Sequence, residues 1–436
     1  MYLNPTPLAI LSFPRDKYWL FASGVLELLH HESNRVTSGY ASHTEEDTES
    51  LNGDDDIASP LANLASLENL NSSLDRLSLH HHHHQPSSAE GEDGTTELKT
   101  SVIDNSSKQD DDANLYKVAL NDEDFYGENY FFHIAFTPIE CTIICSANRI
   151  DQLFRQPLEI CSQLKYDNIN LLSSDFLIIQ VDSDSSLDNS TRILHLTKPL
   201  AENNIPLFFI STHFNDNVVI PFDLRDKVVD ILSKNKFQFS DVSNSYFSTN
   251  ETGNAVATEE IISAEILEKH TFDLFRQFEI VPRIDSNTKL LLTGARAGEI
   301  NSTILKFGRI LSSKDLVPKY IAITRTSINE VSLILPKSSK LRSKMGFKSK
   351  NIIGSTQDVI MPIAIDFSKL PLDSTGIVSG VASKLINGLR HENLDCPFEI
   401  NFLSMAQSGI LMIPQEYGVV ILRILQSPIQ TDQVLD

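Results

Sequence analysis

An internal duplication is the feature of this sequence that most constrains its fold. Ser211 and Ser404 stand 193 residues apart, and Ile220-Pro221 and Ile413-Pro414 stand at the same offset. In both halves these residues flank two short apolar strands, with a helix before them and another after. A pattern that recurs at a fixed offset predicts repeated structural units. We therefore expect two equivalent halves.

Short apolar stretches of strand length alternate along the chain with amphipathic stretches of helix length. The predicted strands are 8–13, 130–136, 141–145, 175–182, 208–212, 218–220, 290–293, 320–324, 331–335, 359–366, 399–403 and 410–413. The predicted helices are 18–29, 191–203, 224–234, 300–311, 377–389 and 417–425. Each half then contains two strand-helix-strand-strand-helix-strand units. Right-handed crossovers put both helices of such a unit on one sheet face, so we expect an α+β protein of four βαββαβ, ferredoxin-like units.

The acidity of the chain is concentrated in one segment. The net charge is −22 over 436 residues, yet residues 43–128 alone contain 21 Asp and Glu against 4 Lys and Arg. This composition, rich in Ser and Asn, predicts a disordered acidic insertion over residues 32–128. The rest of the chain is close to neutral. Nucleic-acid binding needs a basic face that displaces counterions, so we do not expect it.

Three local features have more than one interpretation. The histidine run 80–84 could bind a metal but has no fixed geometry, and low-complexity sequence is the simpler explanation. Five leucines in the insertion fall at helical spacing, which suits a partner-binding helix or a transient one: Leu64, Leu67, Leu70, Leu74 and Leu77. The basic run 337–350 is a solvated loop or a surface for an anionic partner.

The expected domain organisation follows from these patterns. The ranges are 1–31 plus 129–172 for the first unit, 32–128 for the insertion, 173–240 for the second unit, 241–284 for a linker, 285–350 for the third unit and 351–430 for the fourth. No stretch has the 18 or so apolar residues of a membrane span, and the N-terminus lacks a signal-peptide pattern. We therefore expect a cytoplasmic protein.

Catalysis and cofactor binding are not expected from this sequence. The four cysteines are too sparse for a disulfide framework or a zinc site. The histidines outside the insertion lie in no motif with a Ser or Cys nucleophile and an orienting acid. We expect no enzyme activity and no cofactor.

Two sets of segments resemble the CASTOR family, the ACT-domain cytosolic arginine sensors for TOR complex 1. The run 374–378, which opens a helix, together with Phe402-Leu403-Ser404 and Ile413-Pro414, looks like that family's last ACT domain. The run 199–202, followed by Ile205, Ile210-Ser211-Thr212 and Asp216, is similar to its second. The resemblance omits the insertion and the expected linker.

This resemblance implies a non-enzymatic regulator made of four ACT units, with an amino acid held between the second and the fourth. The matching positions are Leu207, Asp216, Asp373, Ser374, Thr375, Gly376, Met405 and Gly409. Backbone amides at the start of the helix after Gly376 would hold the ligand's carboxylate.

The sequence departs from the family at the residues that select arginine. Ser374 stands where the family has a glutamate, Gly409 where it has an aspartate, and Pro206 where it has a serine. Recognition of a guanidinium uses carboxylates, so arginine is not the expected ligand. A smaller neutral amino acid and a site that has lost its ligand both remain open.

Two functions are compatible with these observations. The first is an amino-acid-binding nutrient sensor that acts on TOR complex 1 signalling through a protein partner, a GATOR-type complex. The alternative is a ligand-free interaction scaffold that uses the ACT sheets and the leucines of the insertion. A homodimer is a further expectation, since exposed edge strands of such units pair between copies.

Overall fold

The computed structural model describes residues 1–41, 130–172, 175–182, 189–239, 257–313, 315–371, 374–392, 394 and 399–428. Most of the predicted acidic insertion lies outside these residues. Its expected start at residue 32 is wrong, because helix α1 (Tyr18–Ala41) continues to Ala41. The helix extends beyond Leu29 because Glu32 and Ser33 are also buried, and Glu32 forms an ion pair with the fully buried Arg325 at 3.1 Å.

The described elements form four similar units in chain order. The first contains β1 (Tyr2–Pro14), α1, β2 (Phe132–Phe136), β3 (Glu140–Ser146), α3 (Ala147–Gln163) and β4 (Asn170–Leu171). The second contains β5 (Phe176–Asp182), α4 (Asn189–Glu202), β6 (Phe208–Ser211), β7 (Asn215–Pro221) and α5 (Arg225–Lys234). The third contains β9 (Leu290–Ala295), α7 (Ile300–Leu311), β10 (Ile321–Ser327), β11 (Glu330–Pro336), α8 (Ser339–Lys344) and β12 (Ile352–Ile353). The fourth contains β13 (Ile360–Asp366), α9 (Ile377–His391), β14 (Asn401–Ser404), β15 (Ser408–Pro414) and α10 (Gly418–Gln426).

The stretch expected to be a linker, 241–284, contains two further elements. Helix α6 (Ala257–Gln277) packs along α9, and β8 (Arg283–Ile284) pairs with β13. Helix α6 forms here because its apolar side chains, such as Phe272 and Phe275, enter the core beneath the fourth unit. Strand β8 thereby takes the place beside β13 that β4 and β12 take beside β1 and β9.

Neighbouring units join edge to edge, and the joined sheets close into a barrel. The first and third units have the strand orders β4-β1-β3-β2 and β12-β9-β11-β10. Strand β2 pairs with β10, and β6 with β14, which couples the first unit to the third and the second to the fourth. Pairs β1–β5 and β9–β13 then connect the two coupled sheets. The sheets of the four expected units therefore join into one closed ring of the same twelve strands that the sequence predicts.

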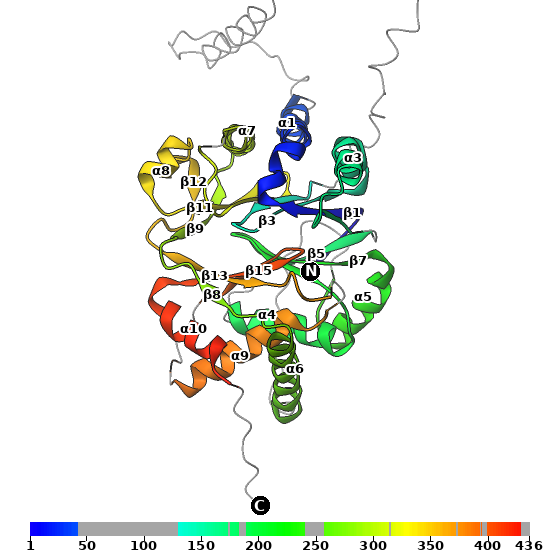
Figure 1. The fold of residues 1–436 in the computed structure, drawn as a ribbon, viewed down its shortest axis with the longest axis vertical. Helices are drawn as coiled ribbons and strands as arrows, with labels where there is room; N and C mark the ends of the chain where they lie inside the picture. Colours follow the sequence, from blue (N-terminus) through cyan, green and yellow to red (C-terminus); the bar gives the residue numbers. More distant parts are fainter. Residues whose placement is uncertain are drawn as a thin grey trace, which may run out of the picture. The chain divides into compact units, whose positions relative to one another are not determined.

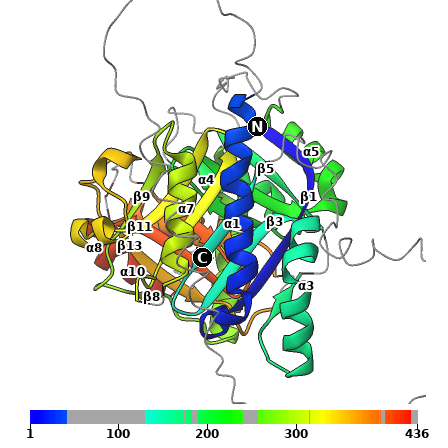
Figure 2. The same ribbon diagram turned by 90° about the horizontal axis from the view of Figure 1, so that it is seen from above.

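The apolar residues divide into three cores. Residues such as Ile10, Ile178 and Met412 fill the interior of the barrel. Helices α1, α3 and α7 cover the outer face of the strands of the first and third units (Figure 1). Helices α4, α5, α6, α9 and α10 cover the outer face of the strands of the second and fourth units. Figure 2 shows α1 and α7 running side by side across the joint of the first and third units. This arrangement leaves α4 and α9 at the corresponding joint of the second and fourth units.

Candidate functional site

A pocket lies at the joint between the second and fourth units. The second unit contributes α4 and the segment that leads into β6. The fourth contributes the segment after β13, the start of α9 and the turn between β14 and β15. The pocket encloses about 740 Å³, including the part that opens to solvent.

The polar end of the pocket is the start of α9. Gly376 precedes this helix with φ +80°, a left-handed conformation that favours glycine. Its carbonyl accepts hydrogen bonds from the Gly380 amide at 2.8 Å and from Thr271 Oγ1 of α6 at 3.2 Å, which fixes the loop. No side chain caps the helix start in the part of the chain that the structure describes. Its first-turn amides therefore suit a carboxylate ligand.

The remaining walls of the pocket are mostly apolar. They include the side chains of Pro206, Leu207, Phe367, Leu370, Phe402 and Met405. Among the described residues, no Asp, Glu, Lys, Arg or His lines the pocket. The hydroxyl groups of the lining include those of Ser374 and Thr375, and Ser374 Oγ donates to the Pro371 carbonyl at 2.7 Å. A ligand with a charged side chain would find no counter-ion among these lining side chains.

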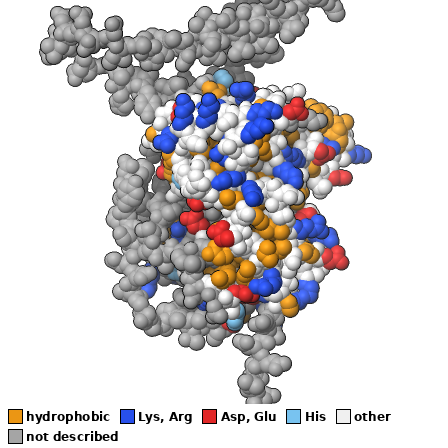
Figure 3. All heavy atoms as spheres, turned by 90° about the vertical axis from the view of Figure 1, so that its left-hand side faces the viewer, with side chains coloured by type: hydrophobic (Ala, Val, Ile, Leu, Met, Phe, Trp, Pro, Cys, Tyr) orange, Lys and Arg blue, Asp and Glu red, His pale blue; other side chains and the backbone are white. Residues whose placement is uncertain are grey.

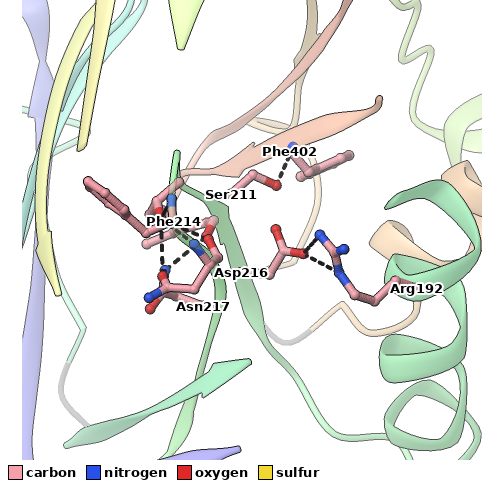
Figure 4. Close-up of polar contacts among 9 residues, drawn as sticks. Arg192, Ser211, Phe214, Asp216, Asn217 and Phe402 are labelled. Carbon is pink, nitrogen blue, oxygen red and sulfur yellow. Dashed lines mark hydrogen bonds and ion pairs between the residues drawn. The ribbon is translucent and has the colours of Figure 1, made fainter. Parts of the chain in front are cut away.

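The two units that form the pocket hold each other through reciprocal hydrogen bonds. Ser211 Oγ accepts from the Phe402 amide at 3.0 Å (Figure 4). In the other direction, Ser404 Oγ accepts from the Phe209 amide at 2.9 Å. These are the two serines related by the 193-residue offset. The repeat in the sequence therefore corresponds to a pair of cross-unit bonds beside the pocket.

The structure does not bring Asp216 to the pocket lining. Its carboxylate accepts two hydrogen bonds from Arg192 of α4, from Nη2 at 2.6 Å and from Nε at 2.9 Å (Figure 4). Asp216 is only 2% exposed, and burial raises the pKa of its carboxyl group although the Arg192 guanidinium opposes this shift. The carboxylate thus binds an arginine of the chain itself.

The other predicted site residues fall into three groups. Leu207, Ser374, Thr375, Gly376 and Met405 line the pocket together. Gly409 lies behind the wall, since a Cβ there would stand 2.8 Å from Cε2 of Phe367. Asp373 lies outside the described residues.

Sequence reasoning missed Phe367 and Leu370, which form much of the apolar wall. It also missed the contribution of α4, namely Thr197 and Ala201. The apolar residues directly after the predicted strand 359–366 were the available signal for the first two.

The basic run 337–350 is partly structural. Lys337 Nζ donates to the Gln357 carbonyl at 2.9 Å, and the buried Arg342 donates to the Pro336 carbonyl at 3.1 Å. Lys340, Lys344, Lys348 and Lys350 are exposed. Lys and Arg side chains spread over the upper part of the face that carries α8 (Figure 3). The expectation of a loop is wrong for residues 339–344, which form α8, while the exposed lysines keep a surface for an anionic partner as a prediction.

Comparison with known proteins identifies one part of the chain. A family model described as an ACT domain matches residues 171–234, the second unit and one wall of the pocket. The chain therefore contains an ACT domain in its second unit, and this match suggests a regulatory, amino-acid-binding role for that unit. No curated protein matches it.

The solved structures that are similar to this chain include one titled the crystal structure of aspartate kinase from Synechocystis. It is 10% identical, with a TM-score of 0.23, and the match covers 67% of this chain and 48% of the other. This chain thus matches about half the length of that one. Within the described residues, every helix is too short or too polar to cross a membrane.

Proposed function

We propose that this chain is a non-catalytic regulatory protein that binds one free amino acid between its second and fourth units. One observation carries the proposal: the uncapped start of α9 opens into a pocket whose other walls are apolar. The amides of α9 hold the ligand's carboxylate, and the apolar walls receive its side chain. The ACT match to the second unit supports this use of the joint.

The ligand in this proposal has an uncharged side chain. Leu207, Phe402 and Met405 offer apolar surface, and the described lining residues supply no carboxylate for a guanidinium or ammonium group. Burying a charge without a partner costs several kcal/mol in proteins. Arginine is therefore the wrong ligand for this pocket, and a neutral amino acid such as leucine or methionine is the right class.

The wider role follows the CASTOR resemblance. In this proposal all four units are ACT units, and the chain is a cytoplasmic nutrient sensor that acts on TOR complex 1 through a GATOR-type complex. The repeated strand order of the first and third units supports the four-unit assignment. Linkage then requires the amino acid and the partner complex to change each other's affinity by the same factor.

A thermal-shift screen against single amino acids tests the proposal. A ligand at a hundred times its Kd stabilises the folded chain by about 2.7 kcal/mol. We expect a neutral, apolar amino acid to raise the Tm and arginine to leave it unchanged. Leu207→Trp fills the pocket from a half-buried position and should abolish the shift.

The matched control is Leu305→Trp on the exposed face of α7, which should leave the shift intact. A purified GATOR-type complex, titrated with the chain in the presence and absence of the active amino acid, measures the linkage. If no amino acid raises the Tm, the sensor proposal is wrong and the ligand-free scaffold becomes the better explanation.

A further inference from the structure

The hairpin between the second and third strands of a unit closes in a repeated way. In three units a hydroxyl at the first turn position accepts a hydrogen bond from the amide two residues later. The pairs are Thr137 with Ile139 at 3.2 Å, Thr212 with Phe214 at 3.2 Å, and Ser327 with Asn329 at 3.3 Å. The first three units therefore satisfy this turn amide within the turn itself.

The fourth unit departs from this rule. Met405 stands 193 residues after Thr212, at the same turn position, and its thioether cannot replace the hydroxyl as a strong acceptor. The amide of Gln407, equivalent to that of Phe214, donates instead to the carboxylate of Glu140, at 3.1 Å to Oε1 and 3.3 Å to Oε2. Glu140 belongs to β3 of the first unit. The turn of the fourth unit is thus held by another unit.

Glu140 is well supplied with donors for this task. Its carboxylate accepts from Ser408 Oγ at 2.6 Å, from Ser12 Oγ at 2.5 Å and from Thr142 Oγ1 at 3.5 Å. The residue is only 1% exposed. Burial raises the pKa of its carboxyl group, while these hydrogen bonds lower it. A charged acceptor with several donors gives stronger hydrogen bonds than a neutral hydroxyl does.

The turn that Glu140 holds is a wall of the pocket. Met405 and Ala406 line the pocket, and the Gln407 carbonyl accepts from the amide of Phe367, another lining residue, at 2.7 Å. Methionine at position 405 gives the pocket an apolar surface that threonine would not give. With methionine at this position the turn lacks the hydroxyl acceptor, and the carboxylate of Glu140 accepts the hydrogen bond of the turn amide instead.

We propose that Glu140 is a positioning residue for the pocket, which fixes the turn 405–408 from the first unit and couples pocket occupancy to β3. This proposal rests on the proposed function for the identity of the ligand. Its structural part, control of the turn, can be tested without any ligand.

Hydrogen exchange of the ligand-free chain tests that part. We expect Glu140→Leu to speed exchange of the Gln407 amide by about tenfold or more, the equivalent of one hydrogen bond to a charged group. If Glu140→Leu does not fold, Glu140→Gln, which keeps one acceptor oxygen, should give a smaller acceleration. Unchanged exchange of Gln407 in the folded variant would overturn the proposal.

A rescue experiment separates positioning from general stability. Adding Met405→Thr to the Glu140 variant restores the hydroxyl of the other three turns and should slow the exchange again. Met405→Val has the shape of threonine without the hydroxyl and should not rescue. Equal rescue by both, or by neither, contradicts the proposal.

Two hydroxyl variants test the coupling. Ser12→Ala and Ser408→Ala each remove one buried donor to the same carboxylate, but only Ser408 belongs to the turn 405–408. With the proteinogenic amino acids added singly, the active one should protect β3 amides in wild type and Ser12→Ala, and not in Ser408→Ala. Protection of pocket amides with no protection of β3 amides would overturn the coupling. Protection of neither would refute the proposed function, and the ligand-free exchange experiment would still test whether Glu140 holds the turn.

Discussion

Asp216 and Gly409 occupy equivalent places in the second and fourth units, 193 residues apart. At the first place a carboxylate holds the guanidinium of Arg192. At the second, the ring of Phe367 fills the space that a side chain would need. In the second unit, the carboxylate at this place therefore pairs with an arginine of the same chain. In the fourth unit, the same place is part of an apolar wall. In the proposed function, Gly409 and Phe367 together leave no room for a carboxylate that would bind a cationic ligand.

A double variant should convert the pocket to a cationic ligand. Gly409→Asp alone would clash with Phe367, so Phe367→Ala must accompany it. We expect the double variant to bind arginine roughly tenfold to a hundredfold more tightly than wild type, because a hydrogen bond to a charged group contributes about 1.5–3 kcal/mol. Calorimetric titration with arginine measures this gain. Phe367→Ala alone is the control, and an equal gain there would contradict the role of the carboxylate.

The ion pair of Asp216 predicts a pH-dependent loss of stability in Arg192→Met. The variant leaves a carboxylate buried without its partner, which costs about 3–5 kcal/mol at neutral pH. Burial already raises the pKa of Asp216, and loss of Arg192 raises it further. A raised folded-state pKa favours folding below the unfolded value of about 3.9, and this contribution is lost as the pH rises through the folded value.

Urea unfolding should therefore show a larger deficit for Arg192→Met at about pH 7 than at about pH 4, where the carboxyl group takes up a proton. Arg192→Met with Asp216→Asn removes the buried charge and should recover most of the stability. A deficit that is the same at both pH values would show that packing of the arginine stem, not its charge, is what matters.

Residues of the pocket were partly predictable from the sequence. Leu207, Met405 and the run 374–376 were named through the family resemblance, and all of them line the pocket. Arg192 was not, since an ion pair across 24 residues depends on how α4 lies against β7. Glu140 gave a signal that was not used: an acidic residue at the start of an otherwise apolar strand, 140–146.

At the scale of elements, the joint between β2 and β10 contains a buried histidine. His133 Nδ1 lies 2.8 Å from Thr324 Oγ1 across this joint, and Nε2 has no hydrogen-bond partner among the described residues. Complete burial lowers the pKa of His133 to about 3. The joint of the first and third units therefore requires a neutral imidazole at physiological pH.

This requirement predicts acid sensitivity. A histidine with a depressed folded-state pKa supports folding fully above its unfolded value of about 6.5, and this support is lost as the pH falls, by about 1.4 kcal/mol per pH unit. His133→Gln keeps a polar partner for Thr324 and cannot titrate, so its unfolding free energy should depend less on pH between about 6.5 and 4. Urea titrations across this range measure the slope. His270→Gln on the exposed side of α6 should keep the wild-type slope, and an unchanged slope in His133→Gln would refute the assignment.

Elements were more predictable than residues, for a physical reason. All twelve barrel strands were expected, because each buries an apolar run that cannot be left in water. Helix α3 was missed: Pro157 interrupts its pattern, yet it lies in the helix. Helix α6 was missed because polar sequence precedes it and its apolar face finds its partners, chiefly α9, only in the folded chain. The three short strands β4, β8 and β12 have two residues each and offer no periodicity.

For the whole molecule, the two connections that close the barrel are unequal. Strands β1 and β5 share four residue pairs, from Tyr2–Gln180 to Leu8–Phe176. Strands β9 and β13 share only Ile360–Leu290. Each backbone hydrogen bond contributes about 0.5–1.5 kcal/mol, so the connection between the third and fourth units should open first. The β6–β14 joint also has a single residue pair, Leu403–Ile210, but the reciprocal hydrogen bonds of Ser211 and Ser404 reinforce it.

Thiol labelling of the native chain can detect this opening. Leu290 beside the weak connection and Ile178 beside the strong one are both buried in the barrel interior, so Leu290→Cys and Ile178→Cys form a matched pair. We expect the Leu290→Cys thiol to be labelled at least about tenfold faster, because fewer hydrogen bonds must break to expose it. The buried native thiols Cys141, Cys145 and Cys161 serve as internal references. Equal labelling rates at the two sites would mean that the barrel opens only by global unfolding. The number of residue pairs at a connection would then not determine where the barrel opens.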